Sequence, residues 1–257
     1  MMDPIAFSLF GLQIRWYGIS IASALVISIF MCLKRAEAKG ISGDKVLDII
    51  LWSVPASIIG ARLYYVFFNW HNYKGDLLSI INIRQGGLAI HGALIFAIIT
   101  GYILCKIKKL NFLQMFDLSA PCIALGQAVG RWGNYFNGEA HGGPTQLPWG
   151  IYVDGVKVHP TFLYESLWCL LLFAFLIFFD NYRHGKSDKR VSFHGQIAFL
   201  YMGLYSFERF FVEGLRTDSL MLGDFKQAQL LSGAVIVSSI LLYIFYRKKQ
   251  KNMKKHI

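Results

Sequence analysis

A polar stretch over residues 130–143, "GRWGNYFNGEAHGG", follows an apolar run and carries several side chains that can bind a ligand. The guanidinium group of Arg131 offers a planar fork of donors that matches the oxygens of a phosphate. The amides of Asn134 and Asn137 can bind a hydroxyl or carbonyl group, and the glycines allow close approach of the main chain. We interpret the stretch as a phosphate-binding site.

Two common ligand motifs are absent from the sequence. The polar stretch is not a Walker loop, because it lacks the lysine followed by serine or threonine, and no HExxH zinc pattern occurs in the chain. The cysteines lie in apolar runs, without the spacing of a disulfide framework or a zinc site. We expect four small buried residues here: Cys32, Cys105, Cys122 and Cys169.

The composition is that of a membrane protein. Of 257 residues, 55% are hydrophobic and 16% are charged, and the mean hydropathy is +0.44, which is too apolar for a soluble domain of this length. The formal net charge of +11 does not indicate nucleic acid, because the basic residues form no single face of a soluble helix. We predict a polytopic protein that contacts membrane lipid and no nucleic acid.

Seven apolar segments are long enough to cross a hydrocarbon core about 30 Å thick, at about 1.5 Å of helix per residue. They cover residues 17–33, 47–68, 88–105, 112–129, 162–179, 196–212 and 228–246. We predict an all-α integral membrane protein with seven transmembrane helices in a single domain, residues 1–257. A small external segment, residues 130–161, is expected between spans four and five.

Basic residues gather after spans one, three, five and seven. They are Lys34, Arg35, Lys39, Lys45, Lys106, Lys108, Lys109, Arg183, Lys186, Lys189, Arg190, Arg247, Lys248, Lys249, Lys251, Lys254 and Lys255. Because cytoplasmic loops are enriched in lysine and arginine, we predict that the N-terminus lies outside and the C-terminus in the cytoplasm. We expect no cleavable signal peptide, because residues 1–13 lack a basic region.

This orientation brings polar side chains from separate spans to one level near the outer leaflet. They are Arg15, Tyr17, Arg62, His91, Arg131, Glu165, Glu208, Arg209 and Glu213. A charged side chain deep in a membrane costs on the order of 3 kcal/mol, so such residues face a polar cavity or one another. We predict a polar cavity that opens outward, where the abundant phosphate is that of a phospholipid.

Several of these residues also have a purely structural interpretation. Arg62 can snorkel to the outer headgroups, His91 can be a neutral packing residue, and the glycines of "GGLAIHGALI" can permit close helix packing. Arg131 and Arg209 can form interfacial ion pairs. The carboxylates available for such pairs are those of Glu139, Glu165, Glu208 and Glu213.

Five stretches, in order along the chain, resemble the prolipoprotein diacylglyceryl transferase family. They are "IRWYGISI", "GGLAIHGALI", "GRWGNYFNGEAHG", "HPTFLYE" and "ERFFVEGLRTD". The signature arginine, two asparagines, glutamate and glycine of the family are matched by Arg131, Asn134, Asn137, Glu139 and Gly142. The remaining stretches supply Tyr17, His91, Arg209, Glu213 and Arg216. Five such matches in order make the resemblance specific.

The resemblance implies an enzyme of the bacterial cytoplasmic (inner) membrane whose active site faces the outer leaflet. Its reaction transfers the diacylglyceryl group of phosphatidylglycerol to the thiol of the lipobox cysteine in a prolipoprotein signal peptide. A thioether forms and glycerol phosphate is released, as the first step of lipoprotein maturation. The resemblance implies no metal and no organic cofactor.

Such a reaction needs a base for a thiol, whose ordinary pKa is about 8.5, and groups that stabilise the leaving phosphate. His91 is the predicted base, and Arg131 with Arg209 are predicted to stabilise the phosphate. The field of the arginines alone is an alternative source of thiolate. Glu139 is expected to orient Arg131 or the peptide. The predicted substrate-binding residues are Tyr17, Arg62, Asn134, Asn137, Glu139, Gly142, Glu213 and Arg216.

Two other classes of protein share an outward polar pocket. A seven-span receptor or anion transporter has one, but a transporter is expected to show an internal repeat or broken helices, and the sequence shows neither. Another lipid-headgroup or acyl transferase also fits. That enzyme is distinguished by whether phosphatidylglycerol is consumed only when a cysteine-containing lipobox peptide is present.

Overall fold

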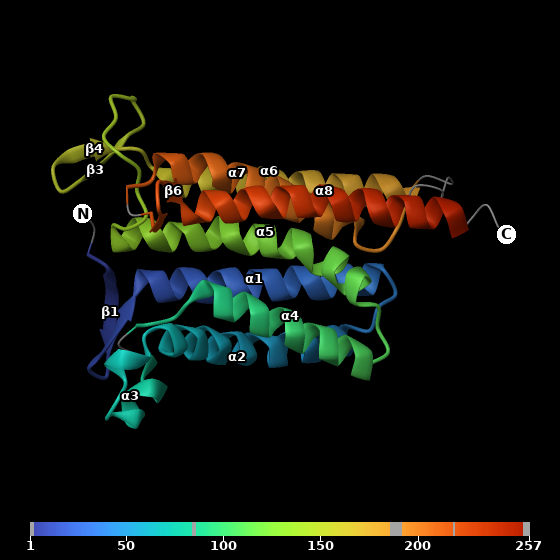
Figure 1. Cartoon of the computed structure of the whole chain (residues 1–257), viewed down its shortest axis with the longest axis horizontal. Helices are drawn as coiled ribbons and strands as arrows, with labels where there is room; N and C mark the ends of the chain where they lie inside the picture. Colours follow the sequence, from blue (N-terminus) through green and yellow to red (C-terminus); the bar gives the residue numbers. More distant parts are fainter. Residues whose placement is uncertain (1–2, 84–85, 186–191, 218, 254–257) are drawn as a thin grey trace. The chain divides into compact units, whose positions relative to one another are not determined.

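The computed structural model describes residues 3–83, 86–185, 192–217 and 219–253, which are mostly helical (Figure 1). The long helices are α1 (Trp16–Ala38), α2 (Gly43–Phe68), α4 (Ile90–Ile107), α5 (Phe112–Asn137), α6 (Thr161–Gly185), α7 (Gln196–Leu215) and α8 (Gln227–Met253). The short elements are β1 (Ile5–Leu9), β2 (Leu12–Arg15), η1 (Trp70–Asn72), α3 (Leu77–Ile81), β3 (Ile151–Val153), β4 (Val156–Val158), β5 (Met221–Leu222) and β6 (Phe225–Lys226). Lys186, Lys189, Arg190, Asp218, Lys254 and Lys255, which belong to the predicted basic connections and the fifth family-like stretch, lie outside the described residues.

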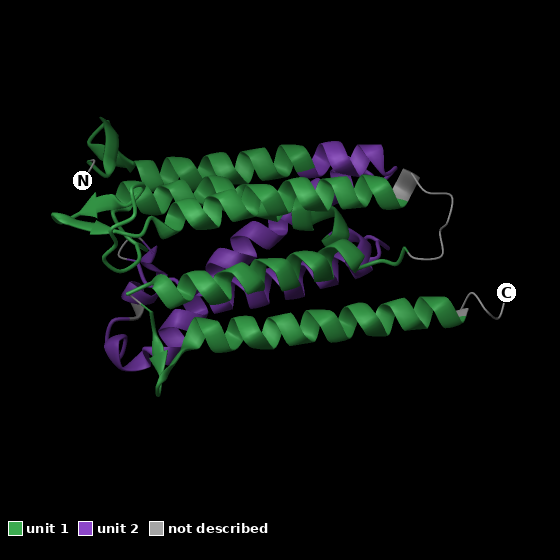
Figure 2. Ribbon diagram, turned by 90° about the horizontal axis from the view of Figure 1, so that it is seen from above, with its two compact units in different colours: residues 1–31, 116–257 green, residues 32–115 purple. Residues whose placement is uncertain are grey.

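The chain divides into two compact units (Figure 2). Unit 1 comprises Met1–Met31 and Phe116–Ile257, and unit 2 comprises Cys32–Met115. The boundaries fall inside α1 and near the start of α5, so each of these helices contributes to both units. Each unit is described here by itself.

Six helices of the described chain are long and apolar enough to cross a membrane: α1, α2, α4, α5, α6 and α8. They expose large apolar side chains, among them Phe30, Trp52 and Leu241, as expected for helices surrounded by lipid. This confirms the prediction of an all-α integral membrane protein. The sixth predicted span, residues 196–212, lies in α7, which is not one of these six helices and which carries Glu208, Arg209 and Glu213.

Helix α5 is longer than the predicted span, which ended at residue 129. Residues 130–137, which we expected in the external segment, continue the helix to Asn137. The aromatic residues of this stretch pack within unit 1: Phe136 stacks on Trp16 with ring centroids 5.3 Å apart, and Tyr135 lies 4.9 Å from Phe162. This packing explains why the helix persists. Gly138, at φ +64°, then ends it.

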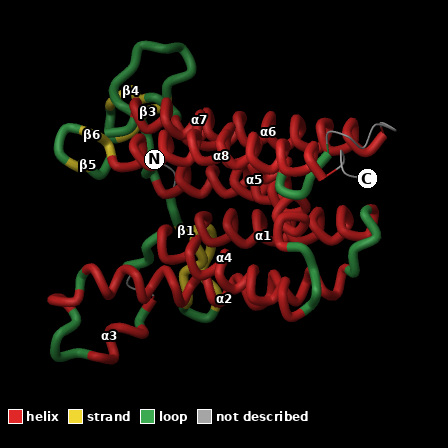
Figure 3. Tube along the Cα trace, turned by 45° about the vertical axis from the view of Figure 1, so that its right-hand side comes forward, coloured by secondary structure: helices red, strands yellow, loops and turns green. Residues whose placement is uncertain are grey.

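Three small hairpins, which were not predicted, gather at one end of unit 1 (Figure 1). The first leads into α1, the second precedes α6, and the third joins α7 to α8. The strands are two to five residues long and form a small part of the trace (Figure 3). The "hairpin end" of unit 1 therefore comprises the start of α1, the ends of α5 and α7, and the starts of α6 and α8.

The core of unit 1 lies between α5, α6 and α7. Its buried members are Ala120, Ala124, Leu172, Leu176, Ile197 and Tyr201. At the end opposite the hairpins, the buried Asp117 of α5 accepts hydrogen bonds from the main-chain nitrogens of Gly195 and Ala198, both at 2.9 Å. A carboxylate in this position caps the first turn of α7 and complements its dipole.

Unit 2 is built on the close packing of α2 and α4. A Cβ atom at Gly92 of α4 would meet the main-chain carbonyl of Gly60 in α2, and one at Gly60 would meet the ring of Phe96. Small residues thus let the two helices approach, as the structural interpretation of "GGLAIHGALI" proposed.

The four cysteines are buried, as expected: Cys32, Cys105, Cys122 and Cys169.

Candidate active site

The buried carboxylate of Glu165 in α6 joins two arginines from neighbouring helices of unit 1. Its Oε2 lies 3.2 Å from Nη1 of Arg131 in α5, and its Oε1 accepts a 2.5 Å hydrogen bond from Nη1 of Arg209 in α7. Glu165 is completely buried, whereas the two arginine side chains keep 19% and 21% of their surface exposed. The two arginines expected at one depth therefore meet at one carboxylate.

Helix α7 supplies further partners for these arginines. Nη2 of Arg209 lies 2.6 Å from Oε2 of Glu213, one turn further along the helix, and Nη2 of Arg131 donates to the hydroxyl of Tyr205 at 3.0 Å. Tyr205 precedes Arg209 by four positions, so both side chains lie on one face of α7. One turn earlier, the Tyr201 hydroxyl donates to Oε1 of Gln127 in α5 at 2.9 Å.

Carboxyl groups outnumber guanidinium groups in this cluster. Arg131 and Arg209 pair with Glu165 and Glu213, and Glu208 is a third buried carboxyl group on the same helix as Arg209. Taking ions out of water costs several kcal/mol each, so the arrangement is stable only where charges compensate closely. Both oxygens of Glu208 are buried and have no hydrogen-bond partner among the described residues.

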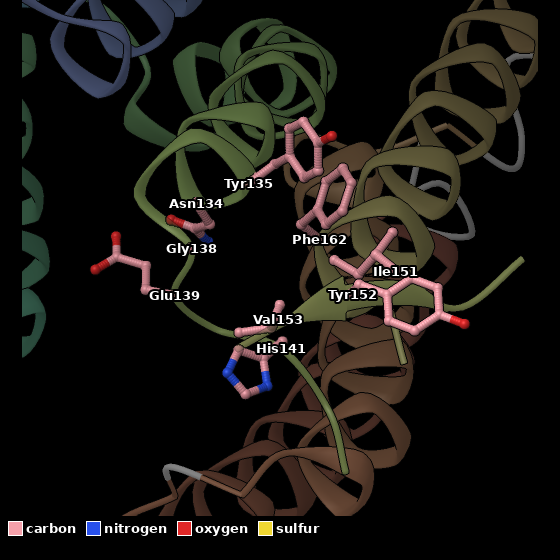
Figure 4. A pocket seen from close by; sticks show the side chains of 9 residues that line it. All are labelled: Asn134, Tyr135, Gly138, Glu139, His141, Ile151, Tyr152, Val153 and Phe162. Carbon is pink, nitrogen blue, oxygen red and sulfur yellow. The ribbon is translucent and has the colours of Figure 1, made fainter. Parts of the chain in front are cut away.

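A pocket of about 200 Å³ lies at the hairpin end of unit 1 (Figure 4). Its lining residues are Asn134, Tyr135, Gly138, Glu139, His141, Ile151, Tyr152, Val153 and Phe162. Figure 4 shows the rings of Tyr135 and Phe162 side by side, with Glu139 on the opposite side of the pocket. Oε1 of Glu139 accepts a 3.2 Å hydrogen bond from Nδ2 of Asn137, and Oδ1 of Asn137 is buried with no hydrogen-bond partner in the described part of the chain. Glu139 therefore contacts Asn137, whereas Arg131 pairs with Glu165.

A second, mostly apolar groove of about 380 Å³ runs along α1, α5 and α6 of unit 1. It is lined by Trp16, Ile19, Ser20, Ser23, Ala128, Val129, Trp132, Phe136, Ser166 and Leu170. Nearby, Tyr17 packs against Gly133, where a Cβ atom would lie 2.9 Å from the Tyr17 ring. Glycine at this position lets the tyrosine lie directly on α5.

The last residues of the polar stretch are held against the end of α7. Gly142 forms an isolated β-bridge with Arg216, and its nitrogen donates to the His159 carbonyl at 2.9 Å. A Cβ atom at Gly142 would lie 2.7 Å from Cβ of His159. Nζ of Lys226 donates to the carbonyls of Glu213 and Arg216, at 2.8 and 2.7 Å, and so caps the C-terminus of α7.

Two of the predicted site residues, Arg62 and His91, belong to unit 2. The buried Arg62 side chain donates to the main-chain carbonyls of Ile80, Ser79, Gly86 and Gly87, at 2.7 to 2.9 Å. The side chain is buried, so it does not snorkel. His91 is partly buried at the start of α4, with its ring centroid 6.0 Å from that of Tyr64.

The structure thus groups most of the predicted site residues at the hairpin end of unit 1. Sequence reasoning missed Tyr205, and it offered Glu165 only as one of four possible ion-pair partners. The spacing of Tyr205 and Arg209 on one helix face was the signal that could have revealed the tyrosine. No group of three or more histidine, cysteine, aspartate or glutamate residues within the described ranges could hold a metal ion.

Comparison with known proteins gives the family. Residues 4–245 match the model of the family described as prolipoprotein diacylglyceryl transferase. A phosphatidylglycerol–prolipoprotein diacylglyceryl transferase of Finegoldia magna is 51% identical over 249 residues, which cover 96% of this chain and 97% of the relative. The proteins of that name from Clostridioides difficile and Clostridium kluyveri strain ATCC 8527 are 49% and 45% identical; each match covers 98% of this chain and 98% and 100% of the relative. The chain belongs to the prolipoprotein diacylglyceryl transferase family.

Proposed function

We infer that this protein transfers the diacylglyceryl group of phosphatidylglycerol to a prolipoprotein, the first step of lipoprotein maturation. The acceptor is the thiol of the lipobox cysteine in the signal peptide. A thioether forms at the glycerol carbon, and glycerol phosphate leaves. The names of the full-length relatives and the family match support this assignment.

The observation that best supports this reaction is the pairing of two arginines with Glu165. Arg131 and Arg209 converge on one buried carboxylate, and each keeps about a fifth of its side chain exposed. Guanidinium forks bind carboxylate and phosphate oxygens in the same way. We therefore assign to both arginines the binding of the phosphate of phosphatidylglycerol and the stabilisation of charge as it leaves.

The other residues of unit 1 receive substrate-binding roles. Asn134 and Glu139 line the pocket of about 200 Å³, in which the headgroup or the peptide main chain can be held. Glu213 orients Arg209 through its 2.6 Å ion pair. The apolar groove along α1, α5 and α6 suits an acyl chain. The remaining substrate-binding residues of this unit are Tyr17, Asn137, Gly142 and Arg216.

His91 is the proposed base for the thiol. Histidine is the side chain that acts most often as a general base in enzymes. Arg62 is proposed to position His91 by holding the segment that leads to it. This role is supported by its hydrogen bonds to the carbonyls of Gly86 and Gly87.

The proposed topology has seven spans, namely the six apolar helices described above together with α7, which is the sixth span along the chain. The N-terminus lies outside, the C-terminus lies in the cytoplasm, and residues 138–159 are external. The active site then faces the outer leaflet of the bacterial inner membrane. The positions of the basic residues after spans one, three, five and seven support this orientation, and a single domain, residues 1–257, is proposed to carry it.

Purified protein in detergent tests the activity directly. Phosphatidylglycerol is supplied with a lipobox peptide or with the same peptide carrying serine in place of cysteine, and released glycerol phosphate is measured. We expect release with the cysteine peptide only. Equal release with both peptides, or none with either, would contradict the proposed reaction.

A further inference from the structure

Glu208 is a buried carboxyl group that none of the roles above uses. It precedes Arg209 on α7, is 6% exposed, and has no hydrogen-bond partner for either oxygen among the described residues. It follows Tyr205, whose hydroxyl binds Arg131, by three positions on α7, so Tyr205 and Glu208 lie on one face of that helix. A buried carboxylate without donors is costly, so the group needs a proton or a ligand.

The charge balance of the site favours the proton. Three carboxyl groups, those of Glu165, Glu208 and Glu213, share two guanidinium groups. Lys226, which directly precedes α8, donates to the main-chain carbonyls of Glu213, Gly214 and Arg216 rather than to Glu208, and α8 has no charged residue between Gln227 and Tyr246. A phosphodiester bound between the arginines adds one more negative charge. An ionised Glu208 would repel that phosphate, whereas a protonated Glu208 can donate a hydrogen bond to it.

We propose that Glu208 is a general acid of the transfer reaction, which donates its proton to the leaving phosphate. The inference rests on the proposed function, because it requires a phosphate held by Arg131 and Arg209. Because Glu208 shares a face of α7 with Tyr205, the partner of Arg131, a phosphate bound by Arg131 lies near the same helix face as Glu208.

The proposed transfer conserves protons and electron pairs. The thiol gives its proton to the base of the reaction, and the sulfur forms a bond to the glycerol carbon. The bond from that carbon to the phosphate oxygen breaks, its electron pair stays on oxygen, and the proton of Glu208 moves to the phosphate. Glycerol phosphate leaves as a monoanion. The proton released by the thiol later restores Glu208, so thiol and phosphodiester become thioether and phosphate monoester with no net proton change.

The test compares two lipids with different leaving groups. One is phosphatidylglycerol, and the other carries p-nitrophenol in place of the headgroup glycerol, so that the leaving phosphate is less basic and needs an acid less. Glu208→Gln is expected to lose about 10²-fold to 10⁴-fold in kcat with phosphatidylglycerol. With the p-nitrophenyl lipid the loss should be smaller than with phosphatidylglycerol, because a less basic leaving group makes protonation less important.

Both lipids are measured with one preparation of each variant, so the ratio of their rates does not depend on the folded fraction. Glu208→Asp keeps an acid and should keep the wild-type ratio, and Glu37→Gln, on an exposed glutamate of α1, is the matched control. Equal losses with both lipids, or wild-type turnover of phosphatidylglycerol by Glu208→Gln, would overturn the general-acid role. If the wild-type protein itself transfers nothing to the cysteine peptide, the proposed function fails instead.

Discussion

Arg131 and Arg209 bind opposite oxygens of a single buried carboxylate, that of Glu165, although they lie on different helices. A shared counter-ion fixes the two guanidinium groups next to each other before any substrate arrives. Such preorganisation is what allows donors to stabilise a developing charge without first having to reorient. We therefore expect the two arginines to act on one bound group.

The arginine pair should therefore behave as a unit in kinetics. Arg131→Ala and Arg209→Ala are each expected to lose most of the activity, and the double variant to lose little more, because residues that act on one group are strongly non-additive. Arg131→Lys keeps the charge but not the planar fork, and it should insert normally yet be badly impaired. The measurement is initial diacylglyceryl transfer to a lipobox peptide at matched folded protein.

Free-energy losses that simply add in the double variant would show that the arginines act on separate groups. Wild-type activity in Arg131→Ala would remove the main support for a phosphate site in residues 130–143.

Removal of the bridging carboxylate should destabilise the fold. Glu165→Ala leaves two partly buried guanidinium groups without their shared partner, and breaking a buried pair in this way typically costs about 3–5 kcal/mol. Thermal unfolding in detergent measures the change. Glu139→Ala, at an exposed carboxylate, is the control and should unfold close to the wild-type temperature. Equal unfolding temperatures for the two variants would argue against a stabilising bridge.

A methyl group at Gly142 should displace the segment that joins α5 to the end of α7. The added Cβ would lie 2.7 Å from Cβ of His159 and 3.1 Å from the Leu215 carbonyl, so Gly142→Ala requires a main-chain shift. Overpacking of this kind costs about 1–3 kcal/mol. We expect lower stability together with reduced transfer activity. Gly233→Ala on α8, where no atom lies within 4 Å, is the matched control and should be neutral in both assays.

His91→Asn should separate binding from turnover. If His91 is the base, the variant should bind phosphatidylglycerol as the wild type does and lose about 10²-fold to 10⁴-fold in turnover. Lipid binding and peptide transfer are measured on the same preparation. Near-normal transfer would return His91 to a packing role beside Tyr64.

The membrane topology is tested with reporters. A reporter that is active only outside the membrane should be silent when fused after residue 257 and active when inserted between Asp154 and Gly155, at the β3–β4 turn. The reason is the concentration of basic residues after spans one, three, five and seven. The reverse pattern would overturn the orientation, and activity at both sites would overturn the odd number of spans, α6, α7 and α8, proposed between the two reporters.

The membrane-spanning helices could be predicted because the bilayer requires about 20 apolar residues in each, a signal that no tertiary contact obscures. The common depth of Arg131 and Arg209 followed from the same pattern, and both contact Glu165. The helical continuation to Asn137 could not be predicted from polar composition, because it depends on Phe136 and Tyr135 packing against rings from α1 and α6.

The hairpins and the partners of Arg131 also could not be predicted from the sequence. Strands of two to five residues are too short to show an alternating pattern. The hydroxyl of Tyr205 finds Arg131 only when α5 and α7 pack with one particular register. Likewise, the excess of carboxyl groups around Glu208 emerges from side chains of two helices, Glu165 on α6 and Glu213 on α7.

Helices α5 and α7 are fastened at three successive levels: Asp117 to the start of α7, Gln127 to Tyr201, and Arg131 to Tyr205. A slide of one helix past the other by a single turn, about 5.4 Å, would break all three fastenings together. The contact between α5 and α7 is therefore poorly suited to open for a lipid. We expect a lipid that enters or leaves sideways to part some other pair of helices, while α5 and α7 stay together.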